Sequence, residues 1–261
     1  MSLDLVSKRV MVVSPHYDDA PLSLGQSLVD GDLSRARSVQ VRVVFGRTNW
    51  STLLHPTRSR ARLITAWRRG EEIAAALRFG YSMKALPLEE VILRTGSMDP
   101  DSFRGESSLA EDPLVSRVTA MLRSWRRSCD VLLVPAGLGR HVDHRIVAHA
   151  GVRALRAGLG PVGFYEDRPY TAYLDSADIA AELAELGLSL EPQDVSGPIT
   201  ERVQRDVRRI YRSQMDDYFL DAQQRDREGG TSERLWVPTR RAPRGPGRGC
   251  GSRCRRPQWC P

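Results

Sequence analysis

Long apolar runs are missing from this 261-residue chain. No stretch of about 18 apolar residues occurs, which argues against a membrane-spanning helix. The first residues, MSLDLVSKRVMVV, lack the apolar segment and the small-residue cleavage site of a signal peptide. We therefore expect a cytoplasmic protein. Hydrophobic residues make up 41% of the chain and charged residues 27%, proportions that are usual for a folded domain and exclude wholesale disorder.

Cysteine is scarce, and so is net charge outside one short segment. Of four cysteines, Cys250, Cys254 and Cys260 fall within residues 238–261, so a disulfide scaffold is excluded for the rest of the chain. The same segment contains seven arginines and no acidic residue, which accounts for the whole net charge of +7. Residues 1–237 are therefore neutral overall, and nucleic acid is not an expected partner.

The C-terminal segment has almost no apolar surface to bury. Because residues 238–261 consist mainly of Arg, Gly, Pro and Cys, we expect a disordered tail, either a flexible extension or a reading-frame artefact. No fourth Cys or His lies near its three cysteines, so a closed zinc site is not predicted there. Cys129 is expected to be a core thiol. The predicted organisation is one domain over residues 1–237 followed by this tail.

Short apolar runs alternate with helical patterns along residues 1–237. The runs are typical of strands buried on both faces and cover residues 10–13, 41–45, 131–134 and 161–165. Helices are predicted at 21–29, 60–79, 114–127, 144–157, 177–187 and 199–223. This alternation indicates an α/β fold with a Rossmann-like, doubly wound, mostly parallel sheet flanked by helices. Ligands bind such sheets beyond the carboxyl ends of the strands.

Two polar segments directly follow buried strands, SPHYDDAP at 14–21 and PAGLGRHVDH at 135–144. They contain three of the five histidines in the chain, and two such loops can face each other across one crevice. His16, Asp19 and His144 make a set of two imidazoles and one carboxylate. Such a set leaves coordination positions open, as in a catalytic rather than a structural zinc site. The ligand types favour Zn²⁺, but the same set also suits Fe²⁺.

The other polar residues of these segments are assigned to hydrolysis. A bound Zn²⁺ would lower the pKa of water toward ~7 and polarise a substrate carbonyl. Asp18 is expected to be the general base on that water. His141 is expected either to stabilise an oxyanion or to protonate a leaving amine, and Asp143 to orient a neighbouring imidazole. Taken alone, Asp18 and Asp19 are more typical of helix caps than of metal ligands, and only the pairing of the two segments favours a metal site.

These segments resemble motifs of the LmbE-like, or PIG-L, family of zinc-dependent N-deacetylases. The family motif His-Pro-Asp-Asp-Glu corresponds to residues 16–20, with Tyr17 in place of the proline and Ala20 in place of the glutamate. The motif Gly-x-His-x-Asp-His matches residues 139–144. The resemblance includes an Arg-rich helix at 68–80 and the FYEDRPY segment at 164–170, and it spans most of residues 8–237. It implies a Rossmann-like fold and hydrolysis of an N-acyl amide, commonly on an amino sugar.

The resemblance also implies roles for individual residues. His16, Asp19 and His144 correspond to the zinc ligands, Asp18 to the base, and His141 to the oxyanion or leaving-group partner.

Other positions stay open between two roles. Arg68 stands at the position of a family arginine, and it is either a substrate contact or a solvated helix charge. Residues 165–167 either line the pocket rim or form an ordinary polar loop. His55 is either solvated or at the edge of the substrate site. The segments 46–62 and 93–112 are expected to edge the pocket.

The sequence therefore predicts a metal-dependent hydrolase that removes an acyl group, most simply acetyl, from nitrogen on a small amino sugar or glycoside. One alternative is an amidase acting on a thiol–sugar conjugate or another antibiotic-pathway intermediate. A second is a non-catalytic binding protein on the same scaffold, whose basic tail holds an anionic partner. The acyl group, the sugar and the oligomeric state are not readable, because pocket loops carry no periodicity.

Overall fold

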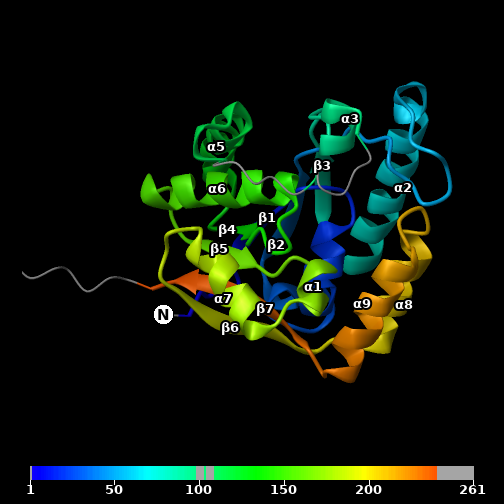
Figure 1. Cartoon of the computed structure of the whole chain (residues 1–261). Coiled ribbons are helices and arrows are strands. Elements are labelled where there is room, and N and C mark those ends of the chain that lie inside the picture. The colour runs from blue at the N-terminus through cyan, green and yellow to red at the C-terminus, as the bar shows by residue number, and fades with distance from the viewer. Residues whose placement is uncertain (1, 98–102, 104–108, 240–261) are drawn as a thin grey trace, which may run out of the picture.

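The computed structural model describes residues 2–97, 103 and 109–239, and Figure 1 labels its elements. Within these residues, seven strands form one sheet in the order β3-β2-β1-β4-β5-β7-β6. They are β1 (Arg9–Ser14), β2 (Ser38–Val43), β3 (Ser82–Ala85), β4 (Val131–Pro135), β5 (Val162–Tyr165), β6 (Leu190–Pro198) and β7 (Ser232–Pro238). Neighbours from β3 to β5 run parallel, and β7 pairs antiparallel with β5 and β6. The predicted doubly wound, mostly parallel sheet is confirmed.

Strand β1 lies inside the sheet, between β2 and β4, and carries side chains into both layers of the core. Val10 and Val12 pack in the cluster that contains α1, α2 and α8, whereas Met11 and Val13 pack in the cluster that contains α5 and α6. Figure 1 shows α5 and α6 on one side of the sheet and α1 and α8 on the other. The helices are α1 (Asp19–Val29), α2 (Ala61–Phe79), α3 (Val91–Thr95), α5 (Pro113–Trp125), α6 (Val142–Arg156), α7 (Ser176–Ala184), α8 (Glu201–Ile210) and α9 (Asp217–Glu228). A strand buried on both faces explains the continuous apolar run.

The predicted helix over 199–223 is wrong, because the chain forms two helices there, α8 and α9. Residues 211–216 separate them, and the side chain of Glu71 accepts hydrogen bonds from the Ser213 amide (3.0 Å) and hydroxyl (2.6 Å). Asp216 then starts α9, because its side chain accepts from the Phe219 amide at 3.0 Å. The break brings the segment between α8 and α9 toward the carboxyl ends of the strands.

Four further outcomes concern the rest of the chain. Strands β3, β6 and β7 were not expected, because they are partly exposed and contain no continuous apolar run. Cys129 is 2% exposed and lies in the core, as predicted. Beyond Thr239, the tail predicted for 238–261 lies outside the described residues. Among the helices of the described chain, none has the length and apolar character needed to cross a bilayer.

We predict opposite effects for alanine at two mid-helix glycines. In α6, a Cβ on Gly151 would lie 2.6 Å from Val134 Cγ2, and this β-branched side chain has little freedom to move away. Gly151→Ala should therefore lower the free energy of unfolding by about 1–3 kcal/mol. In α2, nothing lies within 4 Å of a Cβ on Gly70. Gly70→Ala should therefore raise the free energy of unfolding by about 0.5–1 kcal/mol. Denaturant unfolding checks both, and stabilisation by Gly151→Ala would contradict this packing.

Candidate active site

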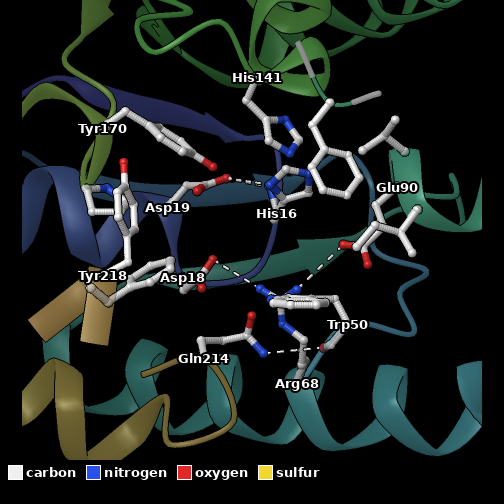
Figure 2. A pocket seen from close by; sticks show the side chains of 15 residues that line it. His16, Asp18, Asp19, Trp50, Arg68, Glu90, His141, Tyr170, Gln214 and Tyr218 are labelled. Atoms are coloured by element: carbon white, nitrogen blue, oxygen red, sulfur yellow. Dashed lines mark hydrogen bonds and ion pairs between the residues drawn. The ribbon is translucent and has the colours of Figure 1, made fainter. Parts of the chain in front are cut away.

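The loops that follow β1 and β4 meet at the carboxyl ends of these two neighbouring parallel strands. The order of the sheet reverses between β1 and β4, which is where doubly wound folds bind ligands. A cavity of about 210 Å³ opens there. Among its lining residues are His16, Asp18, Asp19, Trp50, Arg68, Glu90, His141, Tyr170, Gln214 and Tyr218 (Figure 2).

The Asp19 carboxylate lies between two imidazole rings. Its Oδ2 is 3.4 Å from His16 Nδ1, and its Oδ1 is 3.4 Å from His144 Nε2. Ligand atoms of these three buried residues all lie within 4.8 Å of one another, so the set has the dimensions of a metal site. These residues are the three that the sequence predicts as ligands, and the fold brings them together from the loop after β1, the start of α1 and the first turn of α6.

One polar atom of this set supports a bound cation independently. His144 Nε2 is buried and has no hydrogen-bond partner. Buried polar atoms are nearly always paired, so an unpaired imidazole nitrogen that faces a carboxylate requires an explanation. A metal ion shared with Asp19 and His16 would satisfy it, because nitrogen and carboxylate oxygen are ligands that Zn²⁺ accepts. The residues present therefore fit a divalent ion.

Each imidazole of the set is held by a second carboxylate on the side away from Asp19. Asp143 Oδ2 is 3.0 Å from His16 Nε2, and Asp167 Oδ1 is 2.6 Å from His144 Nδ1. Such carboxylate–histidine pairs fix the orientation of metal-binding rings. Asp143 is thus placed as predicted, beside an imidazole, while the sequence did not assign this role to Asp167.

Asp167 is itself held by backbone amides. Its Oδ2 accepts hydrogen bonds from the Gly137 amide at 2.8 Å and the Leu138 amide at 2.9 Å, both in the loop after β4. The signal that would have identified it is its position two residues after the end of strand β5, since the loops after β1 and β4 are selected in the same way. Its two predecessors do not line the cavity: the Tyr165 hydroxyl donates to the Val13 carbonyl, and Glu166 faces Arg168 and Arg234.

A second possible ligand group, His16, His141 and Asp143, also has the dimensions of a metal site. The oxygens of Asp143 are already engaged, because they accept from the Val91 amide at 2.9 Å and from Arg94 at 2.6 Å. The group containing Asp19 therefore fits an ion better.

The charges of the site are strongly coupled. Burial lowers the pKa of His16, but Asp143 and Asp19 outweigh burial and raise it to about 10. Burial raises the pKa of Asp19, yet the neighbouring His144 and His16 bring it below its usual value. The carboxylate of Asp19 is therefore held in its ionised form, which is the form that binds metals.

Asp18 points away from the metal set. Figure 2 shows its carboxylate directed toward Arg68, whose Nη2 is 3.2 Å from Asp18 Oδ1. The side chain makes no capping hydrogen bond, so the alternative that Asp18 is only a helix cap is wrong. Its backbone has a φ of +89°, a strained conformation for a residue with a side chain, and its amide donates to Glu72. Burial raises the pKa of Asp18, and Arg68 offsets part of that increase.

Arg68 is buried, with 3% of its surface exposed. It donates to the Tyr17 carbonyl at 2.8 Å, and its Nη1 lies 3.6 Å from Glu90 as well as pairing with Asp18. The alternative of a solvated helix charge is therefore wrong. Arg68 lines the cavity and holds two carboxylates on its wall.

His141 lies over the cavity and offers a ring N–H. Its Nδ1 accepts a hydrogen bond from the Asp143 amide at 3.3 Å, so a neutral ring carries its proton on Nε2. Burial, and then the charges of His16 and His144, lower the pKa of His141 well below its usual value. The neutral form is favoured, which makes His141 a hydrogen-bond donor rather than a cation at rest.

The expected edges of the cavity are only partly found. Trp50, from the segment 46–62, and Phe103, from the segment 93–112, both line it. His55 is exposed and is not part of the lining. Gln214, Tyr218 and Phe219 also line the cavity, from the region that the sequence predicted as one unbroken helix.

Comparison with known proteins places the chain among deacetylases. No family model matches it. The 2'-N-acetylparomamine deacetylase of Streptomyces fradiae is 31% identical over 214 residues, which cover 80% of this chain and 74% of the relative. A protein of the same name from Niallia circulans is 26% identical over 187 residues, covering 61% of this chain and 66% of the relative.

Solved structures share the fold. The zinc-inhibited form of teicoplanin deacetylase Orf2 has a TM-score of 0.60 at 20% identity, and the match covers 90% of this chain and 100% of that one. N,N'-diacetylchitobiose deacetylase from Pyrococcus horikoshii has a TM-score of 0.53 at 15% identity, and the match covers 88% of this chain and 84% of that one. Both similarities concern the arrangement of strands and helices.

We predict that Asp167→Asn weakens metal binding. An amide in place of the carboxylate cannot both hold His144 Nδ1 and accept two backbone amides, so the ring loses its fixed orientation. The affinity of chelator-treated protein for added Zn²⁺ should fall about 10- to 100-fold, as measured by competition with a metal indicator. Glu166→Gln, at a neighbouring buried acid that contacts no imidazole, is the matched control. Equal affinity of Asp167→Asn and wild type would contradict the role of Asp167.

Proposed function

This chain belongs to the LmbE-like deacetylase family, and we propose that it hydrolyses the N-acetyl group of an amino sugar within a small aminoglycoside. The relative that is 31% identical is named for such a substrate, 2'-N-acetylparomamine. The observation that carries the proposal is the Asp19 carboxylate between two imidazoles, one of which has a buried, unpartnered nitrogen. A non-catalytic scaffold would have no need for this arrangement beside a cavity.

We propose His16, Asp19 and His144 as the residues that hold the metal, and Zn²⁺ as the ion. When bound, a divalent ion there supplies Lewis-acid polarisation of the acyl carbonyl and eases the deprotonation of water. Three protein ligands leave room for water and substrate, which is the arrangement of catalytic sites.

Asp18 is proposed as the general base and then the general acid. Its carboxylate takes a proton from the water whose oxygen attacks the acyl carbon. It returns that proton to the nitrogen as the carbon–nitrogen bond breaks, which releases acetate and the free amine. A carboxyl whose pKa is raised by burial suits both steps near neutral pH.

Arg68 and His141 are proposed to assist from opposite walls. Arg68 keeps the Asp18 carboxylate on the cavity side by pairing with its Oδ1. The Nε2–H of His141 is available to the oxygen that gains negative charge when water adds to the carbonyl. The predicted oxyanion role of His141 thus uses a neutral N–H donor. Substrate contact by Arg68 remains a prediction.

The function is tested with purified protein loaded with Zn²⁺ and, separately, with Fe²⁺. Acetate release is measured from 2'-N-acetylparomamine and from simple N-acetyl amino sugars. We expect wild type to bind one ion per chain and to release acetate. His144→Ala should lose both the bound ion and the acetate release. Absence of acetate release from all these compounds by the metal-loaded protein would overturn the proposed activity.

We predict that Asp18→Asn lowers kcat by about 10²- to 10⁴-fold, because an amide cannot accept the proton of the attacking water. The bound metal content, measured by elemental analysis, should match wild type, since Asp18 points away from the ligand set. Asp112→Asn is the control: Asp112 caps α5 and does not line the cavity, and asparagine caps equally well. If Asp18→Asn behaved like Asp112→Asn, Asp18 would not be the base.

A further inference from the structure

A second cavity adjoins the active site. It measures about 390 Å³, and its lining shares Phe103, His141, Tyr170 and Tyr218 with the first cavity. The two cavities therefore meet at these four side chains. Figure 2 shows Tyr170 and Tyr218 on the same side of the active site, opposite Glu90. A ligand bound beside His16 and Asp19 can continue past these tyrosines into the second cavity.

The sizes of the two cavities indicate a ligand that occupies both. Binding sites for small molecules usually measure about 300–1,000 Å³. The first cavity, at about 210 Å³, is below this range, whereas the two together fall within it. The space next to the proposed metal ligands thus suits one acetylated sugar ring, and a larger ligand needs the second cavity.

An aromatic wall bounds the second cavity. The rings of Tyr173 and Tyr218 stack with centroids 4.5 Å apart and an angle of 14° between their planes. The Tyr173 hydroxyl donates to the Tyr218 carbonyl at 2.7 Å, and the Arg225 guanidinium lies 4.9 Å from the Tyr173 ring centroid. These contacts hold the wall in place. Flat aromatic faces suit the C–H face of a saturated six-membered ring, and a held wall loses little entropy when a ligand binds.

A carboxylate, Glu182, also lines the second cavity. Glu182 Oε2 accepts from the Gly139 amide at 2.7 Å, and Oε1 is 3.3 Å from Arg140 Nε. Its side chain is only 12% exposed. An ionised carboxylate accepts about four hydrogen bonds, so Glu182 retains acceptor capacity for hydroxyl or ammonium groups.

We propose that the second cavity binds the ring that is glycosidically linked to the acetylated amino sugar. Tyr218, backed by the stacked ring of Tyr173, packs against this ring, and Glu182 accepts hydrogen bonds from its hydroxyl or ammonium groups. The proposal rests on the proposed deacetylase function and adds that two-ring substrates are preferred over single sugars. It makes Tyr173 and Glu182 specificity-determining residues that lie outside the cavity of the reacting atoms.

The test compares two probes, 2'-N-acetylparomamine with two rings and the methyl glycoside of N-acetylglucosamine with one. The variants are Tyr173→Ala and Glu182→Gln. The ratio of kcat/KM for the two-ring probe to that for the one-ring probe is the readout. Wild type should favour the two-ring probe, and each variant should lower the ratio about tenfold or more, mainly through KM. This readout separates binding of the second ring from any disturbance of His141, because such a disturbance slows both probes alike.

Two control variants are available. Glu185→Gln changes an acid on the same turn that pairs with Arg140 and Arg145 but does not line the second cavity. Trp67→Ala removes an aromatic ring from the outer surface of α2. Both should keep the wild-type ratio.

The outcomes are distinguishable. If wild type hydrolyses both probes equally, or both variants keep the wild-type ratio, the second cavity is not a ring subsite although the deacetylase function stands. If metal-loaded wild type hydrolyses neither probe, the proposed function fails and the subsite fails with it. Should Tyr173→Ala not fold, as judged by thermal unfolding, Glu182→Gln alone decides.

Discussion

The contact on which this site depends is the Asp19 carboxylate between His16 and His144. It exists because β1 and β4 are neighbouring parallel strands whose following loops meet at one edge of the sheet. At 3.4 Å, each carboxylate–imidazole distance is too long for a strong hydrogen bond and leaves His144 Nε2 without a partner. A divalent ion shared by the three side chains would resolve both features at once. The strand order of the sheet therefore determines which side chains meet in the site, and so determines its chemistry.

Two outer carboxylates extend this constraint into the fold. Asp143 connects His16 to the backbone of α3, and Asp167 connects His144 to the loop after β4. Asp18 is fixed separately, by Arg68 from α2 and by Glu72, which accepts its backbone amide. Different residues therefore position the proposed base and the proposed metal ligands. A substitution that displaces one of them can leave the other in place. Strain at Asp18, with its φ of +89°, is stored where the proposed proton transfer occurs.

The sequence allowed the sheet, its central strands and the convergence of His16, Asp19 and His144 to be predicted. Buried strands leave continuous apolar runs, and polar residues directly after them have few structural explanations. Asp167 also follows a buried strand and could have been selected for that reason. A single carboxylate after a strand, however, does not show which imidazole it will contact. Strands β3, β6 and β7 were not predicted, because a partly exposed strand has no continuous apolar run.

The sequence wrongly predicted one helix over 199–223, and it did not identify the substrate. Both have the same physical cause. Apolar periodicity reports only which face of a helix is buried, and it continues across the break at 211–216 because Tyr211 is itself core. The break depends instead on hydrogen bonds from Ser213 to Glu71, two residues far apart along the chain. That break places Gln214, Tyr218 and Phe219 on the cavity wall. These side chains of the cavity wall are thus positioned by long-range polar contacts, which leave no local pattern. The proposed metal ligands are positioned by the strands, which do leave one.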